Sequence, residues 1–203
     1  RIVEYARQIL DFLGGRDIDI AIIACNTATA AAWEEVKDEY PFPVLGVINP
    51  GVRGALAATR NKKVGVVATQ FTIESEAHKS GIQAMEPEAE VIGQACPKFT
   101  LLVETGKTSG PEVEEAVSGY FETFKGTGID TLVLGCTHYP VLLDTIRRYI
   151  GPGVTIVDPA VETVAEAKKL LQRRDWSLIA LFRSTISTPA ATPTCSPRWG
   201  HRY

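Results

Sequence analysis

The chain has 203 residues, of which 45% are hydrophobic and 22% charged, which is typical of a globular protein with a sizeable core. Its net charge of −3 and its lack of a basic patch argue against nucleic acid as a partner. No apolar stretch approaches the ~20 residues of a membrane helix, and no secretory signal is present. Four cysteines without a Cys-x-x-Cys pair indicate no disulfide framework and no zinc site, so we expect reduced thiols in the cytosol.

Hydrophobic periodicity predicts alternating helices and strands along most of the chain. In chain order we expect a helix over 2–13, a strand over 18–24, a helix over 28–36, a strand over 44–48, a helix over 51–60, a strand over 64–68, a helix over 72–82, a strand over 90–92, a loop from Cys96-Pro97, a helix over 111–124, a strand over 131–134, a helix over 140–150, a strand over 155–157 and a helix over 161–171. Because the chain opens inside a helical pattern without methionine, we expect its natural start to lie upstream.

The pattern favours an α/β fold with mainly parallel sheets. Strands 18–24, 64–68 and 131–134 are almost continuously apolar, as in strands that are buried on both faces of a parallel sheet. Residues 22–27, Ile-Ile-Ala-Cys-Asn-Thr, are echoed by residues 133–138, Val-Leu-Gly-Cys-Thr-His. We therefore expect two similar lobes with the active site in the cleft between them.

The end of the chain departs from this pattern. Helical periodicity fades after Leu171, and residues 184–202 are rich in serine, threonine, proline and arginine. Residues 172–203 thus form a tail that matches neither lobe. Disorder and a frameshifted gene end are the two explanations left open.

Two cysteines stand where reactive thiols are made. Cys25, Thr69 and Cys136 each follow a predicted strand, and ligands of open α/β sheets bind beyond the carboxyl ends of the strands. Unpaired N–H groups of the next helix attract anions there and are expected to lower a cysteine pKa. Neutral groups suited to a carboxylate or an ammonium lie near these cysteines, namely Asn26, Thr27, Thr69, Thr72 and Thr137.

Each of these features also has a purely structural interpretation. A cysteine at a strand end is often a small buried hydrophobe, and Thr69 and Thr72 are also suitable helix caps. Taken alone, His138 reads as a surface or capping histidine and Glu104 as a solvated loop carboxylate. Cys96, next to proline, is interpreted as structural. Cys195 lies in the tail and receives no role.

Several stretches together carry a resemblance to a known family. Residues 24–28, Ala-Cys-Asn-Thr-Ala, and 134–140, Leu-Gly-Cys-Thr-His-Tyr-Pro, resemble the two signature motifs of glutamate racemases. Their cysteines are 136 − 25 = 111 residues apart, as expected for that family. The stretches 64–75, 96–104 and 158–163 match as well, so the resemblance covers about residues 1–171. The family's first strand, with its Asp-Ser motif, and its Pro-Tyr-Gly segment have no counterpart here.

The resemblance implies a chemistry without cofactor or metal. Inversion of an α-carbon needs one group on each face, so Cys25 and Cys136 would be an opposed acid–base pair, with Cys25 serving the D-enantiomer and Cys136 the L-enantiomer. His138 would assist Cys136, Glu104 would tune the same network, and Asn26, Thr27, Thr69, Thr72 and Thr137 would bind substrate. D-Glutamate would supply peptidoglycan synthesis in the cytoplasm.

The resemblance also implies a division into lobes. The first lobe would hold residues 1–48 and the return at 158–171, and the second lobe residues 49–157. The aspartate expected to orient Cys25 belongs to the unmatched first strand, so we expect the chain as it stands to be marginally folded and nearly inactive. A homodimer is left as an open expectation.

Three rival functions remain open at this point. An aspartate racemase, or another racemase of the superfamily, would use the same cysteines, but those relatives typically show glutamate where this chain has His138. A non-catalytic, racemase-derived fragment would bind a small anion without turnover. A zinc hydrolase would use Cys136 and His138 as ligands, although no second pair accompanies them.

Overall fold

The computed structural model describes residues 1–173, and the predicted tail lies almost entirely outside this range. The α-helices are α1 (Ile2–Gly14), α2 (Asn26–Val36), α3 (Ile48–Ala58), α4 (Gln70–Glu74), α5 (Ala77–Met85), α6 (Pro97–Glu104), α7 (Pro111–Phe121), α8 (Leu143–Ile150) and α9 (Pro159–Arg173). The strands are β1 (Ala21–Ile23), β2 (Val44–Gly46), β3 (Lys63–Ala68), β4 (Glu90–Ala95), β5 (Thr131–Gly135) and β6 (Thr155–Val157). The 3-10 turns η1 (Glu122–Phe124) and η2 (Tyr139–Leu142) complete the described part.

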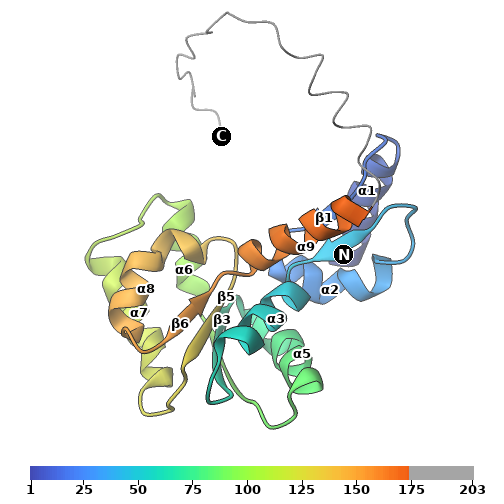
Figure 1. Ribbon diagram of the computed structural model, residues 1–203. Coiled ribbons are helices and arrows are strands. Elements are labelled where there is room, and N and C mark those ends of the chain that lie inside the picture. The colour runs from blue at the N-terminus through green and yellow to red at the C-terminus, as the bar shows by residue number, and fades with distance from the viewer. Residues whose placement is uncertain (174–203) are drawn as a thin grey trace, which may run out of the picture.

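A parallel four-stranded sheet, in the order β4-β3-β5-β6, forms the centre of the larger lobe. In Figure 1 it lies between α6, α7 and α8 on one side and α3 and α5 on the other. Successive side chains of β5 alternate between these layers, because the side-chain period of a strand is two. Leu132 and Leu134 pack into the core under α6, α7 and α8, whereas Val133 packs under α3 and α5.

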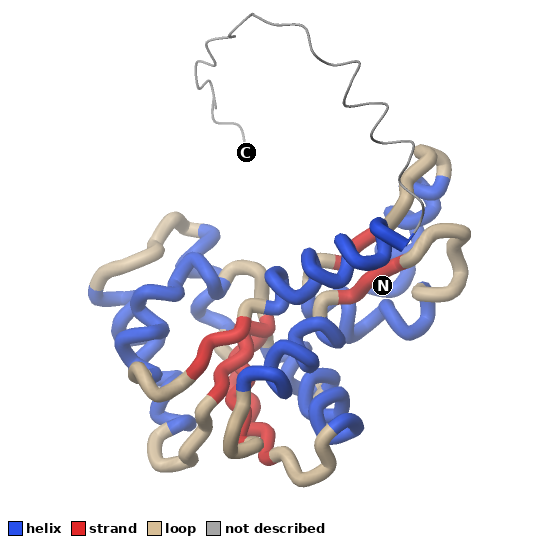
Figure 2. Tube along the Cα trace, viewed as in Figure 1, coloured by secondary structure: helices blue, strands red, loops and turns tan. Residues whose placement is uncertain are grey.

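The smaller lobe is built on the parallel pair β1 and β2, in which Ala21 lies opposite Val44. Helices α1 and α2 pack together beside these strands, as Figure 2 shows. Leu10, Val36 and Phe42 join Ala21 and Val44 in a separate core. The predicted α/β fold with parallel sheets in two lobes is therefore confirmed.

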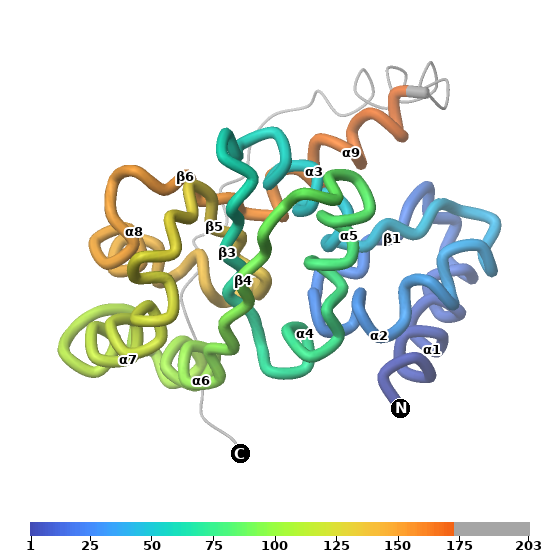
Figure 3. The backbone as a smooth tube through the Cα atoms, turned by 90° about the horizontal axis from the view of Figure 1, so that it is seen from below, coloured from blue at the N-terminus to red at the C-terminus, as the bar shows by residue number. Residues whose placement is uncertain are grey.

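Helices α3 and α9 connect the two lobes. Helix α9 leaves the edge of the larger sheet after β6 and runs across toward β1 and α1 (Figures 1 and 3). It packs closely on α3. A Cβ atom added at Gly51 of α3 would lie only 2.9 Å from Cγ of Pro159 in α9. Since that contact leaves no room for a side chain, glycine allows the two helices to approach each other at this point.

Several predictions of local structure are wrong. The predicted strand over 18–24, expected to be buried on both faces, is limited to Ala21–Ile23, and Ile22 within it is exposed. The predicted helix over 72–82 is broken at Glu76, whose φ of 53° is left-handed and ends α4 before α5 begins. Helix α3 starts at Ile48 and not at residue 51, as was predicted. A proline fits into the first turn of a helix, because the N–H groups of that turn have no partner within the helix and the one that proline lacks is not needed. Pro97 likewise starts a helix, α6, where a loop was predicted. Residues 139–142 form a 3-10 turn before α8 begins.

Candidate functional site

The carboxyl ends of the strands bring the candidate residues together. Ala68 of β3 lies opposite both Gly135 of β5 and Ala95 of β4, so Thr69, Cys136 and Cys96 each follow at the same edge of the larger sheet. In the smaller lobe, Cys25 is the residue before α2, with an extended backbone. The order of residues along these strands thus places the predicted site at the strand ends, as expected for an open α/β sheet.

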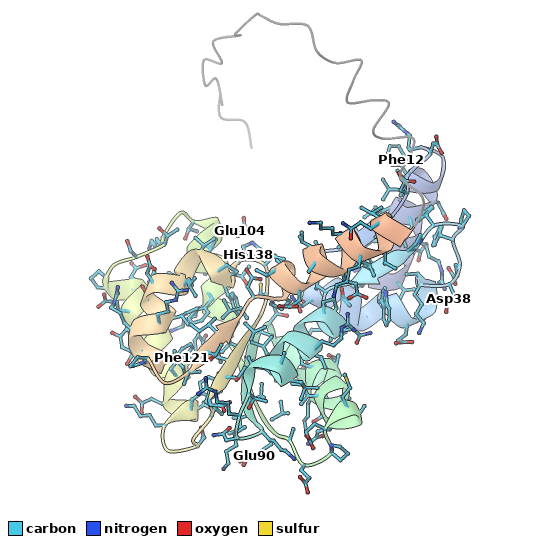
Figure 4. The ribbon with its side chains drawn as sticks, viewed as in Figure 1. Phe12, Asp38, Glu90, Glu104, Phe121 and His138 are labelled. Carbon is cyan, nitrogen blue, oxygen red and sulfur yellow. The ribbon has the colours of Figure 1, made fainter. Side chains whose placement is uncertain are left out.

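Three side chains form a hydrogen-bonded chain that starts at Cys136. Its Sγ lies 3.6 Å from Nδ1 of His138, and Nε2 of His138 lies 2.6 Å from Oε1 of Glu104. In Figure 4, Glu104 and His138 lie side by side. If Nε2 carries the proton that Glu104 accepts, Nδ1 presents a lone pair to the thiol. His138 can therefore take a proton from Cys136 while the carboxylate holds the ring in place.

The electrostatic surroundings of Cys136 differ from the expectation. Burial is the main cause that raises the pKa of this thiol above its ordinary value, and the nearby charge of Cys25 raises it further. A hydrogen bond from the backbone N–H of His138 and one from Thr100 act in the opposite direction. The prediction that this cysteine has a lowered pKa is thus wrong, because only 8% of Cys136 is exposed and desolvation outweighs its donors.

The hydroxyl groups of three threonines meet between the lobes. Oγ1 of Thr27 lies 2.9 Å from Oγ1 of Thr69 and 3.1 Å from Oγ1 of Thr72, and the last two lie 2.9 Å apart. Thr27 belongs to α2, whereas the other two belong to the start of α4. The cluster has three hydroxyl protons that can turn toward an anion, so it can bind a carboxylate without a formal charge.

A cavity of about 420 Å³ lies between the two lobes, a size within the usual range for small-molecule sites. Its wall includes Asn26 from α2 and Cys136 and Thr137 from the end of β5, together with Asp158 at the start of α9. Asn26 is 4% exposed, and among the described residues its Oδ1 has no hydrogen-bond partner. A buried acceptor of this kind favours a ligand that brings an N–H or O–H donor.

Cys25 stands between Ala24 and Asn26, which line this cavity, but it is not itself among the described residues that line it. Its side chain is exposed, at the residue that precedes α2, and it is close enough for its charge to influence the ionisation of Cys136. The first N–H groups of α2 have no partner within the helix, and the Cys25 side chain makes no capping hydrogen bond to them. The structure therefore brings the two cysteines into one electrostatic environment, from two different lobes.

The predicted residues divide into three groups in space. Asn26, Cys136 and Thr137 line the cavity, Thr27, Thr69 and Thr72 form the hydroxyl cluster, and His138 and Glu104 stand behind Cys136. Cys96 is fully buried and, with its thiol aimed at the carbonyl of Gln94, fits its structural interpretation. The described residues contain no group of three or more His, Cys, Asp or Glu side chains that could hold a metal ion.

Sequence reasoning missed Thr100 and Asp158. Oγ1 of Thr100 lies 3.9 Å from Sγ of Cys136. Its position four residues before Glu104 would have placed both on one helix face, had residues 97–104 been recognised as a helix. Asp158 accepts the N–H of Ala160 and so caps α9, a common signal that was available in the sequence.

Comparisons with known proteins show the family to which the chain belongs. The family model described as Asp/Glu/Hydantoin racemase matches residues 2–167. A glutamate racemase of Lactiplantibacillus plantarum is 43% identical over 185 residues, which is 91% of this chain and 67% of the relative. In the described residues, no helix is both long and apolar enough to cross a membrane.

Solved structures are similar over the same extent. A glutamate racemase isoform from Bacillus anthracis superposes with a TM-score of 0.82 at 33% identity, covering 86% of this chain and 65% of that one. A glutamate racemase from Francisella tularensis, solved in complex with D-glutamate, gives 0.77 at 32%, covering 95% and 68%. The chain thus spans about two thirds of the length of these relatives. Given the match over most of its residues, the chain belongs to the Asp/Glu/hydantoin racemase family.

Proposed function

We propose that the protein acts as a cofactor-independent glutamate racemase, in which Cys25 and Cys136 are the two acid–base groups. The relatives with the same family assignment are named glutamate racemases, and one of their structures holds D-glutamate. The observation that carries the proposal is the chain from Cys136 to His138 to Glu104. It ends at the wall of a cavity to which both lobes contribute.

The reaction balances when one cysteine of the pair is a thiolate and the other is a thiol. One cysteine, as thiolate, takes the α-proton of glutamate and becomes a thiol, while the other thiol gives its proton to the opposite face of the α-carbon and becomes a thiolate. The product therefore leaves the pair in the reverse protonation state. Burial opposes the thiolate form of Cys136, so His138, backed by Glu104, is a suitable local acceptor for the proton of this cysteine.

Recognition of the substrate would rest mainly on neutral donors. The hydroxyls of Thr27, Thr69 and Thr72 and the first N–H groups of α2 can donate to a carboxylate. The unpartnered Oδ1 of Asn26 can accept from the ammonium group. Donors fixed by the fold also stabilise the negative charge that develops on the substrate when the α-proton leaves, because they need no reorganisation.

The assay offers L-glutamate, without pyridoxal phosphate, to the chain as it stands and to a restored version that carries the family's first strand upstream, and it follows the formation of D-glutamate by chiral chromatography. The restored version should form D-glutamate until the two enantiomers are equal, because mirror-image molecules have equal free energies in water, whereas the chain as it stands should be nearly inactive. L-Aspartate is the parallel substrate. Turnover of aspartate alone would make aspartate the proposed substrate in place of glutamate. Turnover of neither substrate would favour an anion-binding fragment.

The proposal extends to the cell. D-Glutamate made in this way would supply peptidoglycan synthesis. We therefore propose that the protein works in the cytoplasm. Deletion of the gene in a bacterium without another source of D-glutamate should then require D-glutamate in the medium for growth. Normal growth without the supplement would contradict this role.

A further inference from the structure

Helix α6 directs two polar side chains at the segment that carries Cys136. Thr100 and Glu104 are one turn apart and therefore share a face of the helix. Glu104 reaches His138, whereas Oγ1 of Thr100 lies 3.9 Å from Sγ of Cys136 itself. The thiol is thus contacted from α6 by a hydroxyl that none of the roles described above includes.

Rigid contacts fix the distance between α6 and this thiol. The hydroxyl of Tyr139 donates to the carbonyl of Cys96 at 2.9 Å, just before α6 begins. The ring of Tyr139 also meets that of Phe99 edge to face, with 5.1 Å between centroids. Tyr139 and Phe99 are both fully buried, so Thr100 is held beside Cys136 by a packed core and not by a mobile loop.

The contact changes character with the state of the sulfur. Next to a thiol, the hydroxyl of Thr100 is able to donate or to accept, because S–H is itself a weak donor. Next to a thiolate, only the hydroxyl has a proton, and hydrogen bonds to charged acceptors are the stronger ones. The hydroxyl therefore favours the thiolate over the thiol, against the burial that opposes it.

We propose that Thr100 is a positioning residue of the racemase, whose hydroxyl donates to the Cys136 thiolate and keeps a buried sulfur able to accept the substrate proton. The inference rests on the proposed function for its role in turnover, but the contact itself is independent of it. The other ionisable groups around this sulfur are Cys25, His138 with Glu104, and Tyr139. A test must therefore distinguish the effect of Thr100 from theirs.

Activity alone does not identify the affected cysteine. Because the equilibrium constant between enantiomers is one, kcat/KM must change by the same factor in both directions. Alkylation with iodoacetamide, read for each cysteine by peptide mass spectrometry, reports each thiolate separately. The rate at high pH measures access to the sulfur, and the midpoint of the rate against pH measures its ionisation.

The variants are Thr100→Val, which removes the hydroxyl and keeps the branched shape, and Thr100→Ser, which keeps the hydroxyl. Thr100→Val should move the midpoint for Cys136 to higher pH by about half a unit to one unit. Alkylation of this cysteine should then be about three- to tenfold slower near neutral pH. Thr100→Ser should keep the midpoint of the unmodified chain. The turnover of Thr100→Val should fall by a similar factor, with its pH profile moved in the same direction.

Thr105→Val is the matched control, because the hydroxyl of Thr105 on the same helix donates to the carbonyls of Leu101 and Leu102. Buried Cys96 reports unfolding, since it reacts only when the lobe opens. Should Thr100→Val unfold by this criterion, Thr100→Ala provides the second variant without a hydroxyl. An unshifted midpoint for Cys136 in a folded variant, or a shift equally large in Thr100→Ser or Thr105→Val, would overturn the proposal. A shifted midpoint without any racemisation by the restored version of the chain would instead reject the proposed function and leave the contact in place.

Discussion

At the scale of single residues, the two thiols are predicted to be indispensable individually. In the restored version of the chain, replacement of Cys25 or Cys136 by serine should lower racemisation by about 10²- to 10⁴-fold, the usual contribution of a general acid or base, because a serine hydroxyl is a far weaker acid than a thiol. Each variant keeps one working base and should still support one-sided elimination from a β-substituted substrate of one hand. Full racemase activity in either variant would remove that cysteine from the mechanism.

Glu104 is predicted to matter through its contact with His138. Glu104→Gln keeps the shape of the side chain but removes the charge that holds Nε2 of His138, so kcat should fall by about tenfold or more. Glu112→Gln is the control, since Glu112 pairs with Lys107 on the surface and lies outside the site. Equal activity of the two variants would show that Glu104 is only a solvated carboxylate.

At the scale of elements, α5 buries a histidine that makes the fold sensitive to acid. His78 is 3% exposed, neither ring nitrogen has a partner among the described residues, and burial lowers its pKa from 6.5 to about 4. The folded state thus binds fewer protons than the unfolded state between these values. Stability is complete above pH 6.5 and decreases as the pH falls, by up to about 3 kcal/mol at and below pH 4.

Urea unfolding of the chain and of His78→Leu across this pH range tests that assignment. The leucine variant lacks the titrating group, so its free energy of unfolding should depend less on pH between 6.5 and 4. Thr72, Glu76 and Lys79 line the same cavity as His78, so their contributions stay in both proteins and cancel in the comparison. Identical pH dependence in the two proteins would show that His78 finds a partner when folded.

The contact between α3 and α9 gives a second prediction at this scale. Gly51→Ala would bring a methyl group to 2.9 Å from the rigid ring of Pro159, so the free energy of unfolding should fall by about 1–3 kcal/mol. Gly119→Ala, in α7, is the control, because nothing lies within 4 Å of its added Cβ. That variant should be more stable by about 0.5–1 kcal/mol. Equal effects of the two substitutions would mean that α9 does not pack as described.

The elements that sequence reasoning predicted well are those whose patterns have one physical explanation. Strands β3 and β5 are uninterrupted apolar runs and were placed within one residue, because only a strand buried on both faces has that pattern at that length. Helix α6 was missed because Pro97 reads equally well as a loop residue and as the first residue of a helix. The break at Glu76 has no signal in the sequence, since glutamate rarely adopts a left-handed backbone.

At the scale of the whole molecule, the site depends on contacts between residues far apart in the chain. The strand-end rule predicted which residues gather at the edge of each sheet, but not the contact of Thr27 with Thr69 and Thr72, which depends on how the lobes meet. The raised pKa of Cys136 was also missed, because burial is a property of the folded molecule and not of a motif. The division at residues 48, 157 and 171 stays a prediction. Two contacts of a single substrate carbon with the two sulfurs would require a separation of ~6–9 Å between them.

The central claim is that two different groups act on opposite faces of one carbon, and isotope exchange tests it most directly. L-Glutamate is incubated with the restored version of the chain in D₂O without pyridoxal phosphate, and both enantiomers are analysed for deuterium at the α-carbon early in the reaction. With two thiols, the donor has already exchanged with solvent, so the new D-glutamate should carry deuterium while the remaining L-glutamate keeps its hydrogen. D-Glutamate that retains the original hydrogen, or L-glutamate that gains deuterium as fast as product forms, would contradict the two-cysteine account.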